Sequence, residues 1–210
     1  MRRLLVIALA LVFVGVRCLG AEPAPDEKGW VRLFDGSSLD GWKVGENAGS
    51  FKVQDGAIVV NGPVAHLFYA GDVKNHDFKN FEFKTDVMTF PKANSGIYIH
   101  TKYQERGFPK IGYEVQVNNS HTDPKRTGGL YGVEDVYRAP AKDNAWFNVH
   151  ILVRGKHIEV RVDGKKVVDF TEPAGVTGPR RLSSGTFAFQ AHDPVSKVCY
   201  KNVMVRPLPD

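Results

Sequence analysis

Short segments in which apolar and polar residues alternate follow one another along most of this chain, and this pattern constrains its fold more than any other feature. Two pairs of segments, 51–60 and 158–170, turn at Asp-Gly dipeptides, which favour the positive φ angles of two-residue β-turns. No stretch keeps a period of 3.6 residues for a full helix. The pattern is typical of an all-β sandwich. Further strands are expected at 81–90, 95–102, 112–118, 146–154, 185–191 and 198–205.

The first 20 residues have the features of a secretory signal peptide. Two Arg residues precede the apolar run 4–16, and small residues follow it. This run is shorter than the ~20 apolar residues of a membrane span, and no other run in the chain approaches that length. We therefore expect a secreted or periplasmic protein without a membrane span. A lipid anchor at Cys18 is the alternative, but Arg17 stands where a small residue is needed.

The rest of the chain is expected to form a flexible leader at 21–28 and one domain at 29–208, since this length is too short for two ordinary domains. Loss of residues 1–20 would lower the net charge from +5 to +2, because they contain three Arg and no acidic residue. No cluster of Lys and Arg with interleaved aromatic residues occurs, which argues against a nucleic-acid partner. Cys199 would remain as the only cysteine, so no intrachain disulfide is expected.

A row of polar side chains marks the segment 112–118. Because side chains alternate between the two faces of a strand, Glu114, Gln116 and Asn118 share one face. The aromatic and branched residues between them share the other face and are suited to a core. One acid and two amides on a segment so rich in β-forming residues are consistent with a solvated strand face paired to a Lys or Arg, and also with a functional surface, which we favour.

Other segments can extend this polar surface. The strand at 95–102 places Tyr98 and His100 on one side, and the strand that starts at 185 does the same with Gln190 and His192. The long connection 119–137 begins directly after the polar row, as loops that order a binding site often do. Carboxylates and imidazoles serve as acids and bases, whereas amides and Tyr rings suit a sugar. The candidates for catalysis are Glu114, His192 and His100, and those for substrate binding are Tyr98, Gln116, Asn118, Tyr131 and Gln190.

Several motifs occur in an order that identifies a family. They are N-S-G-I-Y at 94–98, G-Y-E-V-Q-V at 112–117, T-G-G-L-Y-G-V at 127–133 and F-A-F-Q-A-H-D at 187–193. Together the motifs resemble the 3-keto-disaccharide hydrolases, formerly a domain of unknown function, over most of the chain from Gly29 to Leu208. The resemblance implies a two-sheet antiparallel jelly-roll sandwich of the concanavalin A-like kind, a site on its concave sheet and a carbohydrate partner.

The resemblance also implies a reaction. A keto group at C3 of a sugar acidifies the hydrogen on C2, so the glycosidic bond can break by elimination across C1–C2, and water adding back gives net hydrolysis. This route needs a base, an acid for the leaving oxygen, and donors or a Lewis acid for the enediolate. Glu114 or His192 would be the base, and the other would give a proton or hold a metal. The cofactor is unknown; a divalent metal ion is possible, with Glu114 and His192 as candidate ligands.

Three alternatives stay open. A retaining glycosidase needs two carboxyl groups about 5 Å apart, and only Glu114 lies on the candidate strand. A non-catalytic carbohydrate-binding module of the lectin kind would use the same amides and Tyr rings without an acid or a base. A purely structural exported sandwich would need neither sugar-binding side chains nor an acid and a base.

Overall fold

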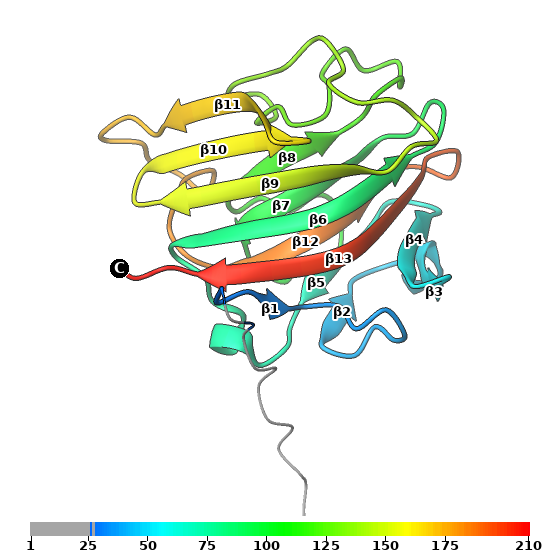
Figure 1. Cartoon of the computed structure of the whole chain (residues 1–210), viewed down its shortest axis with the longest axis horizontal. Helices are drawn as coiled ribbons and strands as arrows, with labels where there is room; N and C mark the ends of the chain where they lie inside the picture. The colour runs from blue at the N-terminus through cyan, green and yellow to red at the C-terminus, as the bar shows by residue number, and fades with distance from the viewer. Residues whose placement is uncertain (1–25, 27) are drawn as a thin grey trace, which may run out of the picture.

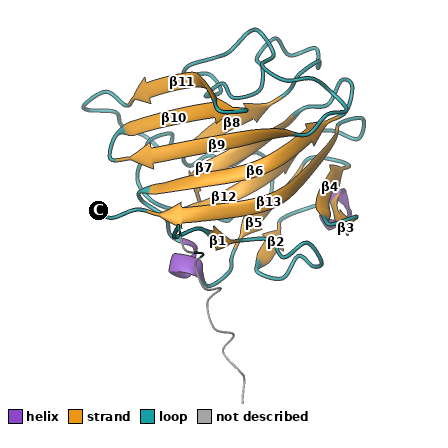
Figure 2. Ribbon diagram, viewed as in Figure 1, coloured by secondary structure: helices purple, strands orange, loops and turns teal. Residues whose placement is uncertain are grey.

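The computed structural model describes residues 26 and 28–210, and its β-strands form two antiparallel sheets (Figures 1 and 2). The expected signal peptide at 1–20, and all but two residues of the expected leader at 21–28, lie outside the described residues. Within the described part no helix has the length and apolar character to cross a membrane. The prediction of an all-β sandwich is confirmed, and so are both Asp-Gly hairpins.

The larger sheet has the strand order β11-β10-β9-β6-β13-β4-β3, and β1 also pairs with β13. Several of its strands alternate strictly between buried and partly exposed residues, which is expected when one face packs on a core and the other meets solvent. The strands are β1 (Val31–Arg32), β3 (Phe51–Gln54), β4 (Ala57–Asn61), β6 (Phe81–Thr89), β9 (Phe147–Arg154), β10 (His157–Val162), β11 (Lys165–Thr171) and β13 (Lys197–Pro207).

The smaller sheet has the strand order β2-β5-β12-β7-β8 and lies behind the larger one in the view of Figure 1. Side chains of β12 that point inward complete the core: Phe187 packs against Phe81 and Phe83, with ring centroids 4.9 and 4.7 Å apart. The outward-facing side chains form the face considered below. The strands are β2 (Trp42–Val44), β5 (Ala65–Tyr69), β7 (Ser95–Thr101), β8 (Tyr113–Val117) and β12 (Thr186–Ala191).

Strand β5 lies between the expected strands 51–60 and 81–90, where the sequence analysis predicts no strand. It occupies an interior position between β2 and β12, and all five of its residues are buried. A strand covered on both faces loses the alternation of polar and apolar residues. The sequence A-H-L-F-Y therefore carries no period-two signal, although it forms a central part of the sheet.

Candidate functional site

The outer face of the smaller sheet brings together polar side chains from β7, β8 and β12. Tyr98 of β7 lies opposite Glu114 of β8, and Gly96 lies opposite Gln116. On the other side of β7, Tyr98 pairs with Ala188 of β12. Because alternate residues share a face, Glu114 and Gln116 project outward with Tyr98, and Gln190 projects outward with Ala188. The alternation of side chains along these strands predicts that these four polar side chains converge, and the structure places them together.

Glu114 is the central group of this face, and its side chain is only slightly exposed. Tyr98 Oη donates a hydrogen bond to Glu114 Oε2 at 2.9 Å, and Gln190 Nε2 donates to Glu114 Oε1 at 3.1 Å and to Tyr98 Oη at 2.9 Å. Burial raises the pKa of Glu114 to about 7, although the donors, Arg180 and His192 pull it down. A carboxyl group of this kind exchanges a proton readily near neutral pH.

Gly96 provides the space for the Glu114 carboxylate. A Cβ atom added to Gly96 would lie 2.2 Å from Glu114 Oε1 and 2.9 Å from Glu114 Cδ. These distances are far below van der Waals contact, so a side chain at position 96 would displace the carboxylate. The glycine of the N-S-G-I-Y motif is therefore required for the observed position of the Glu114 carboxylate.

Several buried polar atoms on this face lack a hydrogen-bond partner among the described residues. Both Gln116 side-chain atoms are in this state, together with Gln190 Oε1, Asn94 Oδ1 and His66 Nε2. Buried polar atoms are almost always paired, since an unpaired one costs free energy. Four of these five atoms belong to residues that line one hollow.

This hollow, which we call the polar hollow, has a volume of about 230 Å³, and its lining residues include Glu114, Tyr98, Gln116, Gln190, Asn94 and His192. Three loops contribute further wall residues: Phe108, Asp123 with Tyr131, and Arg180. Tyr131 Oη donates to Asp123 Oδ2 at 3.1 Å, and Arg180 donates to the Tyr131 carbonyl at 2.8 Å. The expectation that the connection after β8 helps to build the site agrees with this arrangement.

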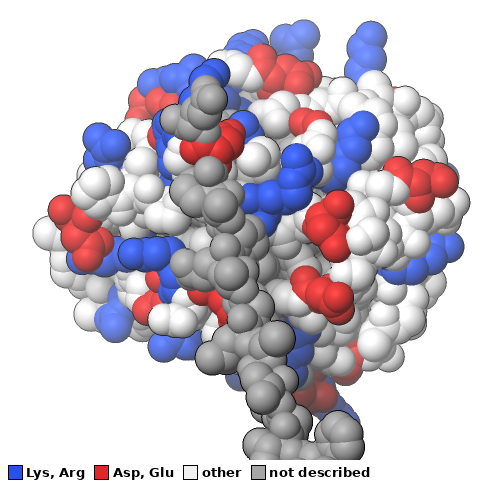
Figure 3. Space-filling model, turned by 60° about the horizontal axis from the view of Figure 1, so that its bottom comes forward, with Lys and Arg blue, Asp and Glu red and all other residues white. Residues whose placement is uncertain are grey.

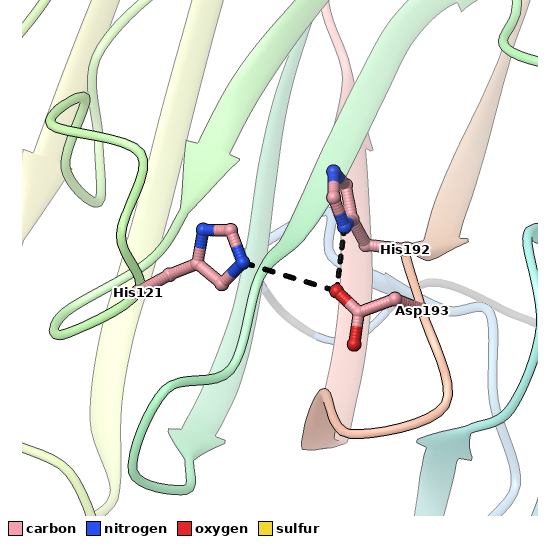
Figure 4. A group of neighbouring side chains, drawn as sticks. All are labelled: His121, His192 and Asp193. Carbon is pink, nitrogen blue, oxygen red and sulfur yellow. Dashed lines mark hydrogen bonds and ion pairs between the residues drawn. The ribbon is translucent and has the colours of Figure 1, made fainter.

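His192 and its neighbour Asp193 form a polar pair beside the hollow (Figure 4). Asp193 Oδ2 lies 2.7 Å from His192 Nδ1, and the turn amides of Val195 and Ser196 donate to Asp193 Oδ1. Burial raises the pKa of Asp193, but the bonds from His192 and Ser196 outweigh it and leave the pKa below its ordinary value. The carboxylate therefore accepts the Nδ1 proton, so that Nε2 of His192 is left for proton exchange.

His121 joins this pair to form a group of two imidazoles and one carboxylate, whose ligand atoms lie within 4.8 Å of one another (Figure 4). Such donors are of the type that binds divalent metals. However, His121 Nδ1 accepts the backbone N–H of Asp123 at 3.0 Å, so its proton is on Nε2, which faces Asp193 Oδ2 at 3.9 Å. A divalent cation that binds this group displaces the protons from the two nitrogens that face Asp193, and Glu114 is not part of the group.

His66 is a site-facing residue that sequence reasoning missed, because β5 was not recognised. Its ring lies 5.3 Å from the Tyr98 ring and 5.7 Å from the Phe108 ring, both in edge-to-face geometry. In the register, His66 pairs with Gln190. Burial, followed by the charge of His192, lowers the pKa of His66 to about 4. The imidazole is therefore neutral near pH 7.

His100 does not lie with the polar side chains around Glu114. The residue has φ 52°, which breaks the alternation of β7, and its ring packs edge-on against Phe81 of the core. His100 Nδ1 accepts the amide of Ser183 at 3.2 Å, and Nε2 lies 2.9 Å from the carbonyl of Lys79. With both ring nitrogens bonded to backbone, His100 has no nitrogen left for substrate.

Asn118 also serves the structure rather than the hollow. Its side-chain amide donates to the carbonyls of Asp123 and Lys125 at 3.0 and 2.8 Å. Its oxygen accepts from His121 N and from Arg126 Nη1 at 2.8 and 3.1 Å. Asn118 therefore orders the loop that carries Tyr131, although alternation along β8 had placed it with Glu114 and Gln116.

The charged side chains on the face drawn in Figure 3 are mixed: Lys and Arg lie among Asp and Glu rather than in one continuous basic area.

Solved structures with the same fold include proteins connected with carbohydrates. A protein from Parabacteroides distasonis, provisionally named a glycosyl hydrolase, has a TM-score of 0.74 at 22% identity and covers 87% of this chain and 95% of its own. The carbohydrate-binding module CBM66 from Bacillus subtilis has a TM-score of 0.57 at 12% identity, covering 79% and 95%. The carbohydrate recognition domain of Emp47p has a TM-score of 0.53 at 12% identity, covering 86% and 96%. At these identities the likeness shows the fold alone.

No curated protein matches the chain significantly. A family model, however, matches residues 29–206, which include β1 to β13 almost completely, and its description is "3-keto-alpha-glucoside-1,2-lyase-like domain". The motifs around Gly96, Glu114 and Gln190, whose geometry is described above, all lie within this range. The chain therefore belongs to the family of 3-keto-alpha-glucoside-1,2-lyase-like domains.

Proposed function

We propose that this protein is an exported enzyme, with one catalytic domain at 29–208, that cleaves the glycosidic bond of 3-keto glycosides by elimination across C1 and C2. The observation that carries the proposal is the buried Glu114 carboxyl, whose pKa is raised to about 7, at the base of a hollow with unpaired amide groups. Family membership supports the choice of a keto sugar as substrate.

The unpaired amides suit the substrate's oxygens. Gln116 offers a donor and an acceptor, and Asn94 and Gln190 each offer a buried oxygen. A sugar presents hydroxyls that both donate and accept, and a keto oxygen that accepts only. We infer that Gln116 binds the keto oxygen through Nε2, where a donor also stabilises the charge that develops on the enediolate.

Glu114 is assigned as the base. Both of its oxygens already accept hydrogen bonds, from Tyr98 and Gln190, and this arrangement holds the carboxylate form against the cost of burial. The carboxylate takes the proton from C2, and the electron pair of the broken C2–H bond moves into the C2–C3 bond as the enediolate forms. Collapse of the enediolate expels the oxygen at C1 and leaves a C1–C2 double bond.

His192 is assigned as the acid. The ring acts in its doubly protonated form: Asp193 holds the Nδ1 proton, the Nε2 proton goes to the departing oxygen, and His192 is left neutral. Water can then add across the C1–C2 double bond, with its hydroxyl going to C1 and a proton returning to C2. Elimination alone makes the protein a lyase, and the water step makes the overall reaction a hydrolysis.

A direct test is incubation of the purified protein with a 3-keto disaccharide and, separately, with its unoxidised parent. Cleavage of the keto compound alone is the expected result. Cleavage of both at similar rates would contradict the elimination route and indicate an ordinary glycosidase. Binding of either without cleavage would instead indicate a carbohydrate-binding module, for which the lectin-like neighbours provide a structural precedent.

Proton exchange separates the two roles. In D₂O the His192→Ala variant should exchange the C2 hydrogen of the keto substrate, observed by NMR, while cleaving the bond slowly, because the base remains. The Glu114→Gln variant should neither exchange nor cleave. A nitrophenyl leaving group, which needs no acid, should restore cleavage in His192→Ala only. Exchange that persists in Glu114→Gln and disappears in His192→Ala would reverse the assignments.

A further inference from the structure

Arg180 brings a permanent positive charge to the wall of the polar hollow. Among the described residues that line this hollow, it is the only Lys or Arg. It lies on the connection between β11 and β12 and is exposed. A guanidinium group stays protonated throughout the pH range in which proteins are folded. The hollow therefore combines a fixed cation with the Glu114 carboxyl group, whose own charge changes near pH 7.

The backbone on both sides of Arg180 is bonded to strands of the smaller sheet. The carbonyl of Pro179 accepts a hydrogen bond at 3.1 Å from the amide of Gly112, which directly precedes β8. The amide of Ser183 donates at 3.2 Å to Nδ1 of His100 on β7. Because β7 and β8 also carry the tyrosine and the acid of the polar hollow, these bonds fix the place of the loop relative to both groups.

The guanidinium group of Arg180 is only partly used within the protein. Nη1 donates to the Tyr131 carbonyl at 2.8 Å, and within residues 28–210 this is the only hydrogen bond of the side chain. The wall carboxylate of Asp123 is bonded instead to the Tyr131 hydroxyl and to the amide of Lys125. The Nε and Nη2 protons of an arginine lie along one edge of the plane, spaced to bind two neighbouring oxygens at once. This edge of Arg180 is available to a ligand.

The charge of Arg180 acts on other groups of the hollow. Burial, the largest influence on Glu114, raises its pKa to about 7, and the charge of Arg180 works in the opposite direction. Burial also raises the pKa of Tyr98, and Arg180 again opposes the change. A sugar in the hollow would exclude water from between these groups, and electrostatic interactions are stronger where water is excluded.

Elimination by the proposed route moves a negative charge from the protein into the substrate. Glu114 begins as a carboxylate and becomes neutral when it takes the C2 proton. The electron pair of the C2–H bond moves into the C2–C3 bond, and the pair of the C3–O double bond moves onto the oxygen at C3. The enediolate then has two oxygens side by side, at C2 and C3, which match the spacing of the Nε–Nη2 edge. The charge leaves with the oxygen at C1, which His192 protonates.

We propose that Arg180 is a further catalytic residue, which binds the C2 and C3 oxygens of the enediolate and stabilises the negative charge that forms there. Gln116 Nε2 adds a neutral donor to the oxygen at C3. This inference rests on the proposed function, since it takes the polar hollow as the place where the C2 proton is removed.

The test compares Arg180→Met and Arg180→Lys with Arg181→Met. Arg181 is the matched control, because it is the next residue, is also exposed and does not line the polar hollow. On a 3-keto disaccharide kcat should fall about 10²-fold in Arg180→Met, the loss typical of one donor to a developing oxyanion. The loss should be smaller in Arg180→Lys, which keeps the charge without the planar fork. Equal kcat values in Arg180→Met and Arg181→Met would overturn the proposal.

A substrate carboxylate is the rival partner for the guanidinium group, and a 3-keto glucuronide tests it. If Arg180 binds the enediolate, Arg180→Met should lower kcat by a similar factor for the 3-keto glucuronide and the 3-keto glucoside. A lower KM for the glucuronide in the wild type, lost in Arg180→Met while kcat for the glucoside stays unchanged, would assign Arg180 to a substrate carboxylate and overturn the proposal.

A binding measurement keeps this role distinct from the proposed activity. Ascorbate, a stable enediolate anion at neutral pH, is titrated into the protein without oxygen and followed by amide NMR. If the wild type cleaves no keto compound, the proposed function fails, but ascorbate should still bind about tenfold more weakly to Arg180→Met than to Arg181→Met, because a charge-assisted hydrogen bond is lost. Equal binding to the two variants, or no binding to the wild type, would overturn the role of Arg180.

Discussion

Two buried glutamates of this protein, Glu114 and Glu172, have similar partners but opposite electrostatics. Each accepts a hydrogen bond from a tyrosine, Tyr98 at 2.9 Å for Glu114 and Tyr113 at 2.8 Å for Glu172. Both are almost inaccessible, with 6% and 3% exposure. The comparison is useful because the tyrosine is shared, so the opposite pKa shifts come from how deeply each carboxyl group lies in the protein and from its remaining partners.

The remaining partners of Glu172 satisfy its charge. Burial raises its pKa, but the ammonium of Lys156, the amide of Leu182 and the Tyr113 hydroxyl outweigh burial and leave the pKa below its ordinary value. Within residues 28–210, Glu114 has only the neutral Gln190 as a second hydrogen-bonded partner, and burial raises its pKa above the ordinary value. The contact with Lys156 makes the Glu172 carboxylate a structural anchor. Glu114 has no cation in contact among the described residues, and its carboxyl group can exchange protons.

The largest expected effect separates the two residues by activity. Glu114→Gln should lower kcat on a 3-keto disaccharide by about 10³-fold, since general-base catalysis contributes about 10²–10⁴. The Glu172→Gln variant should turn over the 3-keto disaccharide at the wild-type rate. It should lose about 1–2 kcal/mol of unfolding free energy, because a charged hydrogen bond becomes a neutral one. Turnover assays and denaturant melts check both. Near wild-type turnover in Glu114→Gln would contradict the assignment of the base.

The next effect tests the space beside Glu114. Gly96→Ala places a methyl group against the carboxylate, and we expect about a 10²-fold loss of kcat/KM, because small displacements of reacting groups cost factors of this size. Gly49→Ala is the control, since a Cβ there meets nothing within 4 Å. The same kinetic assay serves for both. Equal activity in the two variants would show that the position of the carboxylate is not fixed by Gly96.

The pH dependence of stability offers a smaller effect with a definite sign. Glu114 has a folded-state pKa of about 7, above its ordinary value of 4.5, so the folded state binds the proton more tightly. Its contribution to stability is present below pH 4.5 and is lost as the pH rises through 7. Between pH 5 and 8 the wild type should lose ~2 kcal/mol relative to Glu114→Gln, measured by urea unfolding. A difference of the opposite sign would contradict the raised pKa.

The smallest effect concerns the residue that positions His192. Asp193→Asn keeps the shape of the turn but removes the negative charge that accepts the hydrogen bond from His192 Nδ1. We expect about a tenfold loss of kcat, as for other partners that orient an imidazole. The loss should be larger for a disaccharide than for a nitrophenyl leaving group, because only the former needs the acid. Equal losses for both would assign Asp193 a purely structural role.

Sequence reasoning could reach the part of the site that follows strict alternation. Glu114, Gln116, Tyr98 and Gln190 converge because β7, β8 and β12 keep a period of two through these residues. It failed at His100, because a single positive φ turned the side chain into the core. Asn118 keeps the alternation only to the end of β8 and is then used by the loop.

Other parts of the site had no local signal. Strand β5 is covered on both faces, so neither it nor His66 could be recognised by periodicity. The wall residues Phe108, Asp123 and Arg180 come from loops, whose placement depends on tertiary contacts such as the bond from Arg180 to Tyr131. The raised pKa of Glu114 also depends on burial by these segments, which no pattern in β8 alone can show.

The most direct test of this account is a ¹³C NMR titration of the glutamate carboxyl groups in the wild-type protein, with Glu114 and Glu172 assigned from the two Gln variants. We predict that Glu114 titrates near pH 7 and that Glu172 titrates below 4.5. If both carboxyl groups titrate below 4.5, Glu114 is an ordinary ionised residue and its role as the exchanging group of the site is contradicted.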